Sequence, residues 1–355
     1  MFEAIVGQVK LIHSLGGEAF VFAARDEFSE EDSRRLAPAK VHYAESLGPK
    51  PLAYAPGLLA AMEDAQLDCL HLHGIWQGSS LTALRWSKRH PGRTIVSPHG
   101  MLDPWITGRG RLKKIPFWWM VERGNLRSAA VLHALTKDEA KDILRWVSRA
   151  QVRVIRNPVA IAEPRQSELP SPIILYLGRL HEKKNIAALI EAWNAARPDL
   201  PRYSRLRIAG WGDEAIAESI RQAVGESDRS IEFLGAVYGA QKSYVLENAR
   251  FLVLGSHSEG LPMVLLEAWE KGLPTIQTEF CNLPEGYAAG AAILCQTDAR
   301  SIADALVEAL NMGEGEWNEM SRVARMLAQG PFSRKSIARH WGKLYAKVMQ
   351  ETPDG

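Results

Sequence analysis

Cysteine is scarce in this 355-residue sequence, which has only three: Cys69, Cys281 and Cys295. They are odd in number and widely spaced, and no partner motif accompanies any of them. This pattern predicts neither a disulfide framework nor a zinc site. We therefore expect a protein of the reducing cytoplasm.

Long hydrophobic runs are also missing. The chain begins Met1-Phe2-Glu3-Ala4 without a basic segment leading into an apolar run. It has no stretch of about 18 uninterrupted apolar residues, the length that a membrane-spanning helix needs. We expect a chain that carries no obvious export signal and does not cross a membrane.

An excess of charge of one sign is absent as well. The 43 basic and 41 acidic residues leave a net charge of +2, which does not indicate a nucleic-acid partner. Hydrophobic residues make up 46% of the sequence and charged residues 24%, as in ordinary soluble globular proteins. Because 355 residues exceed the size at which one hydrophobic core usually stops growing, we expect two domains.

What the sequence does have is a regular alternation of short apolar segments with longer amphipathic ones. The predicted strands are EAFVFAAR, DCLHLHG, TIVSPHG, AAVLHALT and VRVIRNPV in the first half, and IILYLGRL, LRIAGWG, IEFLGAV, RFLVLGS, TIQTE and AAILCQ in the second. This order predicts an α/β protein with two Rossmann-like, doubly wound domains and parallel sheets. No GxGxxG fingerprint follows a predicted strand of the first half, which argues against a nicotinamide or flavin dehydrogenase.

The polar, proline-bearing segment AEPRQSELPSP separates the two series of strands and has the composition of a linker. We predict an N-terminal domain over residues 1–162, a linker over 163–171 and a C-terminal domain over 172–335. Residues 336–355 carry apolar side chains at helical spacing. They predict a C-terminal amphipathic helix that docks on either domain, with a crossing back to the N-terminal domain as one option.

The segment HSEGLPMVLLEAWEKGLPTI holds the densest group of candidate site residues. A strand ends before it, and a helix starts near Pro262, a residue favoured at the first helical position. The exposed amides at that helix N-terminus form an anion site suited to a diphosphate. Glu259 lies just before this terminus and Glu267 inside the helix, where carboxylates can bind ribose or sugar hydroxyls. The alternative is that Glu259 caps the helix and Glu267 is solvated.

Basic residues follow an earlier strand of the same half. In YLGRLHEKKN a strand ends at Gly178, and Arg179, Lys183 and Lys184 surround the start of the next helix. Positioned cations can neutralise a leaving diphosphate. The alternative, a solvated basic turn, is the better interpretation for Lys183.

YLGRLHEKKN, followed by RIAGWGDE, IEFLGAV and SEGLPMVLLEAW, resembles the retaining group 1 (family 4) glycosyltransferases of GT-B architecture in motif order and spacing. HLHGIW, SPHGMLDPW, the KDEA stretch and CNLPEGYAAGAAI extend the resemblance to nearly the whole chain, and to members that build bacterial surface polysaccharides. The resemblance implies two Rossmann-like domains facing a cleft. It also implies a retaining hexosyl-type transfer from a UDP- or GDP-sugar to a glycan or lipid-linked oligosaccharide, with no bound cofactor and no metal requirement.

The resemblance further implies individual roles. Arg179 and Lys184 would hold the donor diphosphate, Glu267 the ribose hydroxyls and Glu259 the transferred sugar. The expected catalytic residues are Arg179, Lys184, Glu259 and His99. The turn that lines the sugar and phosphate, and the loop beside the nucleotide base, would contribute Gly260, Leu261, Pro262 and Gly212. For Gly212, a plain strand-to-helix turn is the alternative.

Two histidines of the first half each follow a predicted strand and precede a glycine: His73 in HLHGIW and His99 in SPHGMLDPW. Residues just after strands lie where doubly wound domains bind ligands. A neutral imidazole can hydrogen-bond a sugar hydroxyl or a phosphate oxygen, so we assign both residues to the acceptor side. For His99 the resemblance favours contact with donor or acceptor, whereas a structural role is an equal alternative for His73.

Two features depart from the family pattern. The chain begins at what looks like the first helix, FEAIVGQVKLIHSLGG, so we expect the N-terminal domain to lack its first strand and the glycine-rich loop after it. In Arg156-Asn157-Pro158-Val159, proline follows the asparagine where the family generally has glycine, so we expect the hinge between the domains to depart from the family geometry. A degenerate donor-binding protein is therefore one rival function, and a nucleotide-sugar epimerase, which can share the paired-domain architecture, is the other.

Residues 109–119, RGRLKKIPFWW, combine basic side chains, beginning with Arg109, with Trp118 and Trp119. Such a segment is suited to a peripheral contact with the inner face of the cell membrane, where it would hold a lipid-linked acceptor. The alternative, which we favour, is a helix with its tryptophans in the core.

Overall fold

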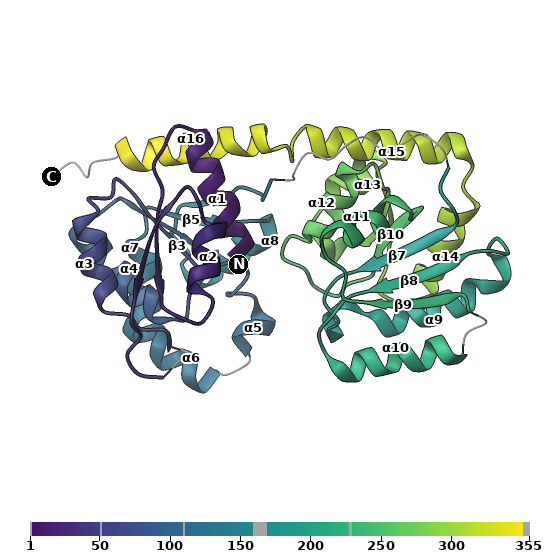
Figure 1. The fold of residues 1–355 in the computed structure, drawn as a ribbon, viewed down its shortest axis with the longest axis horizontal. Helices are drawn as coiled ribbons and strands as arrows, with labels where there is room; N and C mark the ends of the chain where they lie inside the picture. Colours follow the sequence, from purple (N-terminus) through teal and green to yellow (C-terminus); the bar gives the residue numbers. More distant parts are fainter. Residues whose placement is uncertain (1, 50–51, 109–110, 159–168, 227–228, 351–355) are drawn as a thin grey trace. The chain divides into compact units, whose positions relative to one another are not determined.

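The computed structural model describes residues 2–49, 52–108, 111–158, 169–226 and 229–350 (Figure 1). The chain forms two compact units, which we call the first unit (Met1–Pro158 and Arg334–Gly355) and the second unit (Val159–Ser333). The units thus change after Pro158 and after Ser333. Of the predicted linker, 163–171, only residues 169–171 lie within the described part of the chain.

The second unit contains one sheet of six parallel strands in the order β12-β11-β10-β7-β8-β9. These strands are β7 (Ile173–Leu177), β8 (Arg205–Ala209), β9 (Ile231–Gly235), β10 (Phe251–Leu254), β11 (Thr275–Thr278) and β12 (Ala292–Cys295). The chain runs from β7 outward to β9 and then continues at β10 on the other side of β7, so the strand order reverses between β7 and β10. Doubly wound sheets bind ligands outside the carboxyl ends of the strands at this switch point.

Helices lie between the strands of the second unit and after the last of them (Figure 1). They are η3 (Glu182–Lys184), α9 (Ile186–Ala196), η4 (Arg197–Asp199), α10 (Glu214–Glu226), α11 (Gly239–Glu247), α12 (Met263–Glu270), η5 (Glu279–Cys281), α13 (Pro284–Ala289), α14 (Ala299–Asn311) and α15 (Glu314–Gln329). α14 packs on α9, and α15 packs on α12 and α13. β7 and β10 are buried over their whole length, as parallel strands covered on both faces should be.

The first unit contains two parallel sheets. One pairs β1 (Phe20–Ala24) with β2 (Lys40–Ala44), and the other has the order β3 (Leu70–His73), β4 (Thr94–Ser97), β5 (Val131–Ala134) and β6 (Val152–Val154). Within the described residues no strand pairs with both β1 and β3. All eleven predicted strands are present, but the sequence prediction missed β2, whose segment KVHYA is polar at its start and nowhere fully buried.

The described residues of the first unit also include these helical segments: α1 (Phe2–Ser14), α2 (Ser29–Arg35), α3 (Gly57–Asp64), α4 (Gly78–Arg89), α5 (Pro104–Gly108), α6 (Arg111–Phe117), the π-helix η2 (Trp118–Glu122), α7 (Arg123–Ser128), α8 (Lys137–Trp146) and α16 (Arg334–Gln350). α16 belongs to this unit although it follows the second unit in sequence. It buries Ile337, Trp341 and Leu344 in a cluster with Leu11 and Ile95. No helix in the described residues is both long and apolar enough to cross a membrane.

Candidate functional site

At the switch point of the second unit, a lysine and a glutamate form an ion pair. Lys184 Nζ, at the end of η3 after β7, donates to Glu259 Oε1 in the loop after β10 at 2.5 Å. The Ser256 hydroxyl donates to the same oxygen at 2.6 Å. The Glu259 and Lys184 side chains are only 9% and 19% exposed, so water screens their interaction weakly. The structure therefore brings together two of the residues that the sequence pattern predicted for the diphosphate and sugar site.

An asparagine ties the loop after β7 to the loop after β10. Asn185 separates η3 from α9 and has a φ of +58°, a conformation that asparagine tolerates better than most residues. Its Nδ2 donates to the Gly255 carbonyl at 3.0 Å and to the Thr297 carbonyl at 2.7 Å. These hydrogen bonds fix the position of the neighbouring Lys184 relative to Glu259.

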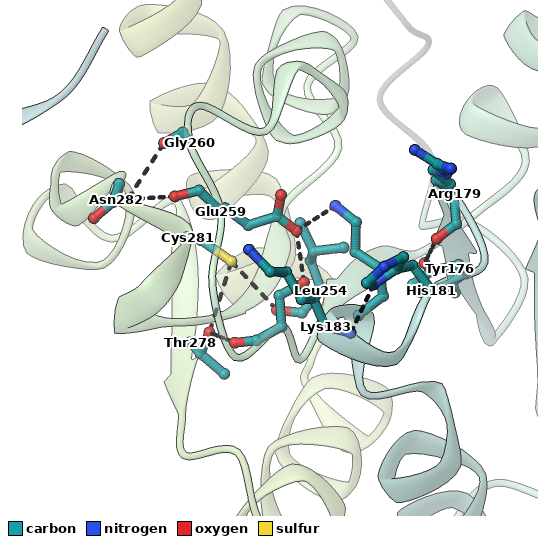
Figure 2. Close-up of polar contacts among 12 residues, drawn as sticks. Tyr176, Arg179, His181, Lys183, Leu254, Glu259, Gly260, Thr278, Cys281 and Asn282 are labelled. Carbon is teal, nitrogen blue, oxygen red and sulfur yellow. Dashed lines mark hydrogen bonds and ion pairs between the residues drawn. The ribbon is translucent and has the colours of Figure 1, made fainter. Parts of the chain in front are cut away.

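The segment after β11 holds the loop that carries Glu259 (Figure 2). Asn282 Nδ2 donates to the Glu259 carbonyl at 2.6 Å, and Thr278 Oγ1 donates to the Ser256 carbonyl at 2.7 Å. Burial raises the pKa of the Cys281 thiol to about 12, so the thiol stays protonated between these two residues. Side chains from a third strand end therefore fix the backbone of this loop through its carbonyl groups.

The helix that follows this loop begins one residue later than the sequence suggested. α12 starts at Met263, and Pro262 is its N-cap residue with a ψ of 95°, so proline precedes the first helical position instead of occupying it. Among the described residues, no side chain caps the first turn of α12. Gly260 and Leu261 fill the short connection from Glu259. A helix N-terminus without a side-chain cap keeps amide groups that can bind an anion.

Glu267 lies in the middle of α12 and pairs with a residue of the neighbouring helix α11. Lys242 Nζ lies 2.6 Å from Glu267 Oε2, and each side chain is about one third exposed. Glu267 is thus neither a free surface residue nor part of the pair formed by Lys184 and Glu259. The sequence pattern did not reveal Lys242, because α11 lies outside every motif that we recognised.

Arg179 is placed differently from Lys184. Its guanidinium lies 5.7 Å from the centre of the Trp211 ring, and Figure 2 shows it apart from the Glu259 carboxylate. The loop that carries Trp211 packs tightly on the loop after β7. Leu180 N–H donates to the Trp211 carbonyl at 2.8 Å, and a Cβ added to Gly212 would lie 2.3 Å from the Leu180 carbonyl oxygen. Close approach of two backbones therefore explains the glycine at position 212.

In the first unit, the two predicted histidines contact each other. His73 is the last residue of β3, His99 follows β4, and His73 Nδ1 lies 2.9 Å from His99 Nε2. Burial, together with nearby positive charge, lowers the pKa of His73 well below its usual value and that of His99 to about 4. At neutral pH both rings are uncharged, and one donates the shared proton while the other accepts it.

A second group of buried polar side chains lies behind this pair. His133 Nε2 lies 2.7 Å from the Ile155 carbonyl, which can only accept, so His133 carries its proton there. Its Nδ1 then accepts from Ser97 Oγ at 2.7 Å, Ser97 accepts from His71 Nε2 at 2.7 Å, and His71 Nδ1 accepts from the Tyr345 hydroxyl at 2.9 Å. The chain of hydrogen bonds joins β3, β4 and β5 to α16. It requires both imidazoles to be neutral.

The tryptophans of the basic segment separate into a packed one and an exposed one. Trp118 packs against Trp146 with ring centres 4.6 Å apart, whereas Trp119 is 63% exposed and has the Arg123 guanidinium 4.5 Å above its ring. A pocket of about 440 Å³ beside them is lined by Trp76, Pro104, Thr107, Gly108, Lys114, Ile115, Trp118, Trp119 and Trp146. The favoured prediction of two core tryptophans is wrong for Trp119, and Trp118 is only partly buried where it packs against the core. Arg109 lies outside the described residues.

The described residues contain no cluster of three or more histidine, cysteine, aspartate or glutamate side chains that could hold a metal ion. All three cysteines are unpaired thiols. The candidate groups are therefore the ion pairs and helix terminus of the second unit and the neutral histidines of the first.

Solved structures share the fold of this chain. The Anabaena protein Alr3699/HepE, in complex with UDP and glucose, matches with a TM-score of 0.73 at 16% identity over 97% of this chain and 95% of that one. A glycosyltransferase from Rickettsia africae matches with a TM-score of 0.76 at 14% identity over 99% of this chain and 95% of that one. Two α/β domains with parallel sheets place the chain in the GT-B class.

Two family models match the sequence, one in each unit. "Glycosyl transferase 4-like domain" matches residues 6–158, and "Glycosyl transferases group 1" matches residues 171–312. Together they cover most of the chain. The chain belongs to the group 1 glycosyltransferases.

Curated relatives include bacterial glycosyltransferases. O-antigen chain mannosyltransferase B of Escherichia coli is 24% identical over 226 residues, 58% of this chain and 57% of that protein. A Campylobacter jejuni α-1,4-N-acetyl-D-galactosaminyltransferase, named for a PP-undecaprenol-linked saccharide, is 25% identical over 248 residues, 66% of this chain and 65% of that protein. The chain spans 57%, 25% and 65% of the length of the first three curated relatives, which is less than two thirds in each case.

Proposed function

We propose that this protein transfers a hexosyl group from a UDP- or GDP-sugar to a glycan or lipid-linked acceptor, with retention of configuration, during synthesis of a bacterial surface polysaccharide. The observation that carries this proposal is the ion pair of Lys184 and Glu259 at the switch point of the second unit, beside the uncapped start of α12. Family membership and the polysaccharide-building relatives support it.

The second unit supplies the groups that a nucleoside diphosphate donor needs. Negative charge grows on the diphosphate as the bond to the sugar breaks, and the Lys184 ammonium and the amides of α12 are placed to stabilise it. Arg179 contributes once its guanidinium leaves the Trp211 ring. The carboxylates of Glu259 and Glu267 accept hydrogen bonds from hydroxyls of the sugar and the ribose. The likeness to a UDP-bound structure supports a donor of this class.

The first unit supplies the neutral side chains that an acceptor needs. His99 and His73 are uncharged at neutral pH, so either ring can donate to or accept from a hydroxyl. No carboxylate has to attack the sugar, because the leaving phosphate oxygen can take the proton of the acceptor hydroxyl on the same face. We expect no metal requirement. The exposed ring of Trp119 beside Arg123 supports a peripheral contact with a membrane that carries the acceptor.

Thermal unfolding with nucleotides tests the proposal. The purified protein is heated with UDP, GDP, ADP and CDP and with their sugars, in the presence and absence of EDTA. A nucleotide that binds the native state and is present at 100 times its Kd stabilises that state by about 2.7 kcal/mol, which raises the Tm. We expect nucleotides of one base to give this rise and the others to give none. No shift with any nucleotide would contradict the proposal. Conversion of a nucleotide sugar to its epimer without an acceptor would show an epimerase instead.

A further inference from the structure

The loops that present the two histidines of the first unit have an unusual backbone. After His73, Gly74 has a φ of +80° and Trp76 a φ of +68°. After β4, His99 itself has a φ of +53° and Gly100 a φ of +76°. Residues other than glycine seldom adopt this left-handed conformation, and they keep it only where the surroundings hold them in place.

A buried glutamate of α8 holds the loop of His99. Glu139 is 7% exposed, and its Oε1 accepts the Gly100 N–H at 2.6 Å while its Oε2 accepts the Leu135 N–H at 2.7 Å. Thr136, the N-cap of α8, accepts the N–H of Glu139 at 3.1 Å and fixes where the side chain starts. One carboxylate therefore joins the residues that follow β4 and β5.

A second buried glutamate holds the loop of His73. Glu122 is fully buried at the end of the π-helix η2, and its Oε1 accepts the Trp76 N–H at 2.6 Å. Asn125 Nδ2 donates to its other oxygen at 3.1 Å. π-helical turns are rare and frequent at functional sites, and this one ends at the residue that reaches the loop.

The two loops are also joined to each other. Trp76 Nε1 donates to the Met101 carbonyl at 3.1 Å, and the Ile75 N–H contacts Met101 Sδ at 3.3 Å. With the contact between His73 and His99, the two loops and their glutamates form one connected unit.

Both oxygens of each glutamate accept a hydrogen bond, which favours carboxylates at these positions. Burying a carboxylate is costly, and burial raises the pKa of both Glu122 and Glu139. A carboxylate differs from an amide because both of its oxygens only accept, so it can hold two donors at fixed positions. That property matters where two loop backbones must keep one geometry.

We propose that Glu122 and Glu139 are positioning residues that hold His73 and His99 in the geometry that the acceptor reaction requires. The proposal rests on the proposed glycosyl transfer. Neither glutamate is assigned a contact with a substrate. Their effect is exerted through the backbone N–H groups of the two loops.

The test replaces each glutamate by glutamine. In Glu139→Gln, one oxygen becomes an amide that faces a backbone N–H, so at least one hydrogen bond is lost. A hydrogen bond to a charged group is worth enough for an effect of about tenfold or more. The matched control is Glu63→Gln in the same unit, because the Glu63 carboxylate pairs with the side chains of His90 and Arg89.

Hydrogen exchange by mass spectrometry reports on the loops without any substrate. We expect amides of residues 98–102 to exchange about tenfold faster in Glu139→Gln, and those of 74–77 in Glu122→Gln, with the second unit unchanged. Glu63→Gln should leave both loops protected. Unchanged exchange in both loop variants would overturn the proposal, whether or not the protein is a transferase.

Kinetics separate a positioning role from a merely stabilising one. Binding of UDP and GDP should be unchanged in Glu139→Gln, while release of the nucleoside diphosphate from the preferred donor sugar falls about tenfold. In a His99→Ala background the same substitution should cost less than about threefold, because its effect acts through His99. Equal losses in both backgrounds would overturn the positioning role. If the wild type binds no nucleotide, the proposed transfer fails, and the exchange experiment still tests the two glutamates.

Discussion

The two units hold their loops in opposite ways. In the second unit, neutral side chains such as Asn185, Thr278 and Asn282 donate to backbone carbonyl groups around Glu259. In the first unit, Glu122 and Glu139 accept from backbone N–H groups. In these contacts the second unit satisfies backbone carbonyl groups with neutral side-chain donors, whereas the first unit satisfies backbone N–H groups with buried carboxylates.

The two units also differ in the charge of their candidate site residues. The second unit pairs Lys184 with Glu259 and Lys242 with Glu267, and each pair keeps hydrogen-bonding groups for a charged ligand. The first unit gathers imidazoles that are neutral at physiological pH because burial lowers their pKa. A fold that repeats the same α/β plan therefore carries paired charges in one unit and neutral imidazoles in the other, and we propose that the first group binds a diphosphate and the second uncharged hydroxyls.

The largest expected effect concerns the charged site. Lys184→Ala removes the ammonium that we propose stabilises the leaving diphosphate, so we expect the transfer rate to fall about 10²- to 10³-fold. The variant should keep its fold, because the hydrogen bonds of Asn185 to the Gly255 and Thr297 carbonyls still hold the loop after β7. Initial rates with the preferred donor sugar, and circular dichroism, check both parts. Lys183→Ala is the control, since the sequence assigned Lys183 to a solvated turn; equal losses in the two variants would contradict the role of Lys184.

The fold could be predicted from the sequence wherever strands are buried on both faces. β7 and β10 read as continuous apolar runs and were found without a structure. β2 was missed because its small sheet leaves the strand only partly buried, so its hydrophobic pattern is weak. Trp119 was misplaced because periodicity does not tell which of two adjacent tryptophans faces the core, and a π-helix changes the spacing there.

The candidate site could be predicted only in part. Lys184 and Glu259 each follow a strand in a motif, and the strand order brings those two strand ends together. Lys242 has no local signal, because its importance comes from a helix packed beside α12. Glu139 entered the sequence analysis only as part of the KDEA stretch, without a role of its own. Its burial and its two backbone partners come from the meeting of β4, β5 and α8.

A smaller expected effect concerns pH and should distinguish the units. The pKa of His133 is lowered to about 4 in the folded protein, against about 6.5 in an unfolded chain. Between these values the unfolded state binds the extra proton, so stability is lost as the pH falls from about 6.5 to 4, by about 3 kcal/mol for this residue. Hydrogen exchange at pH 7.5, 6 and 5 should show the first unit opening before the second.

The variant His133→Asn separates the contribution of His133 to the pH dependence of stability from the contributions of other titrating groups. The raised pKa of Glu122 and Glu139 acts in the opposite direction, because their protonation favours the folded state as the pH falls. The comparison is therefore between wild type and His133→Asn. The stability difference between the two proteins should shrink as the pH falls from 6.5 to 4. A difference independent of pH would show that burial does not suppress protonation of His133.

The smallest expected effect returns to the charged site and asks whether Glu267 binds ribose or only its helix neighbour. Glu267→Ala should raise the Kd of the preferred nucleoside diphosphate about tenfold, the value of a lost hydrogen bond to a charged group. It should also abolish discrimination between that nucleotide and its 2′-deoxy and 3′-deoxy forms, measured by calorimetry. Lys242→Ala is the matched control, since it breaks the same ion pair and leaves the carboxylate in place. Equal affinities in all three proteins would mean that the pair serves only to join α11 to α12.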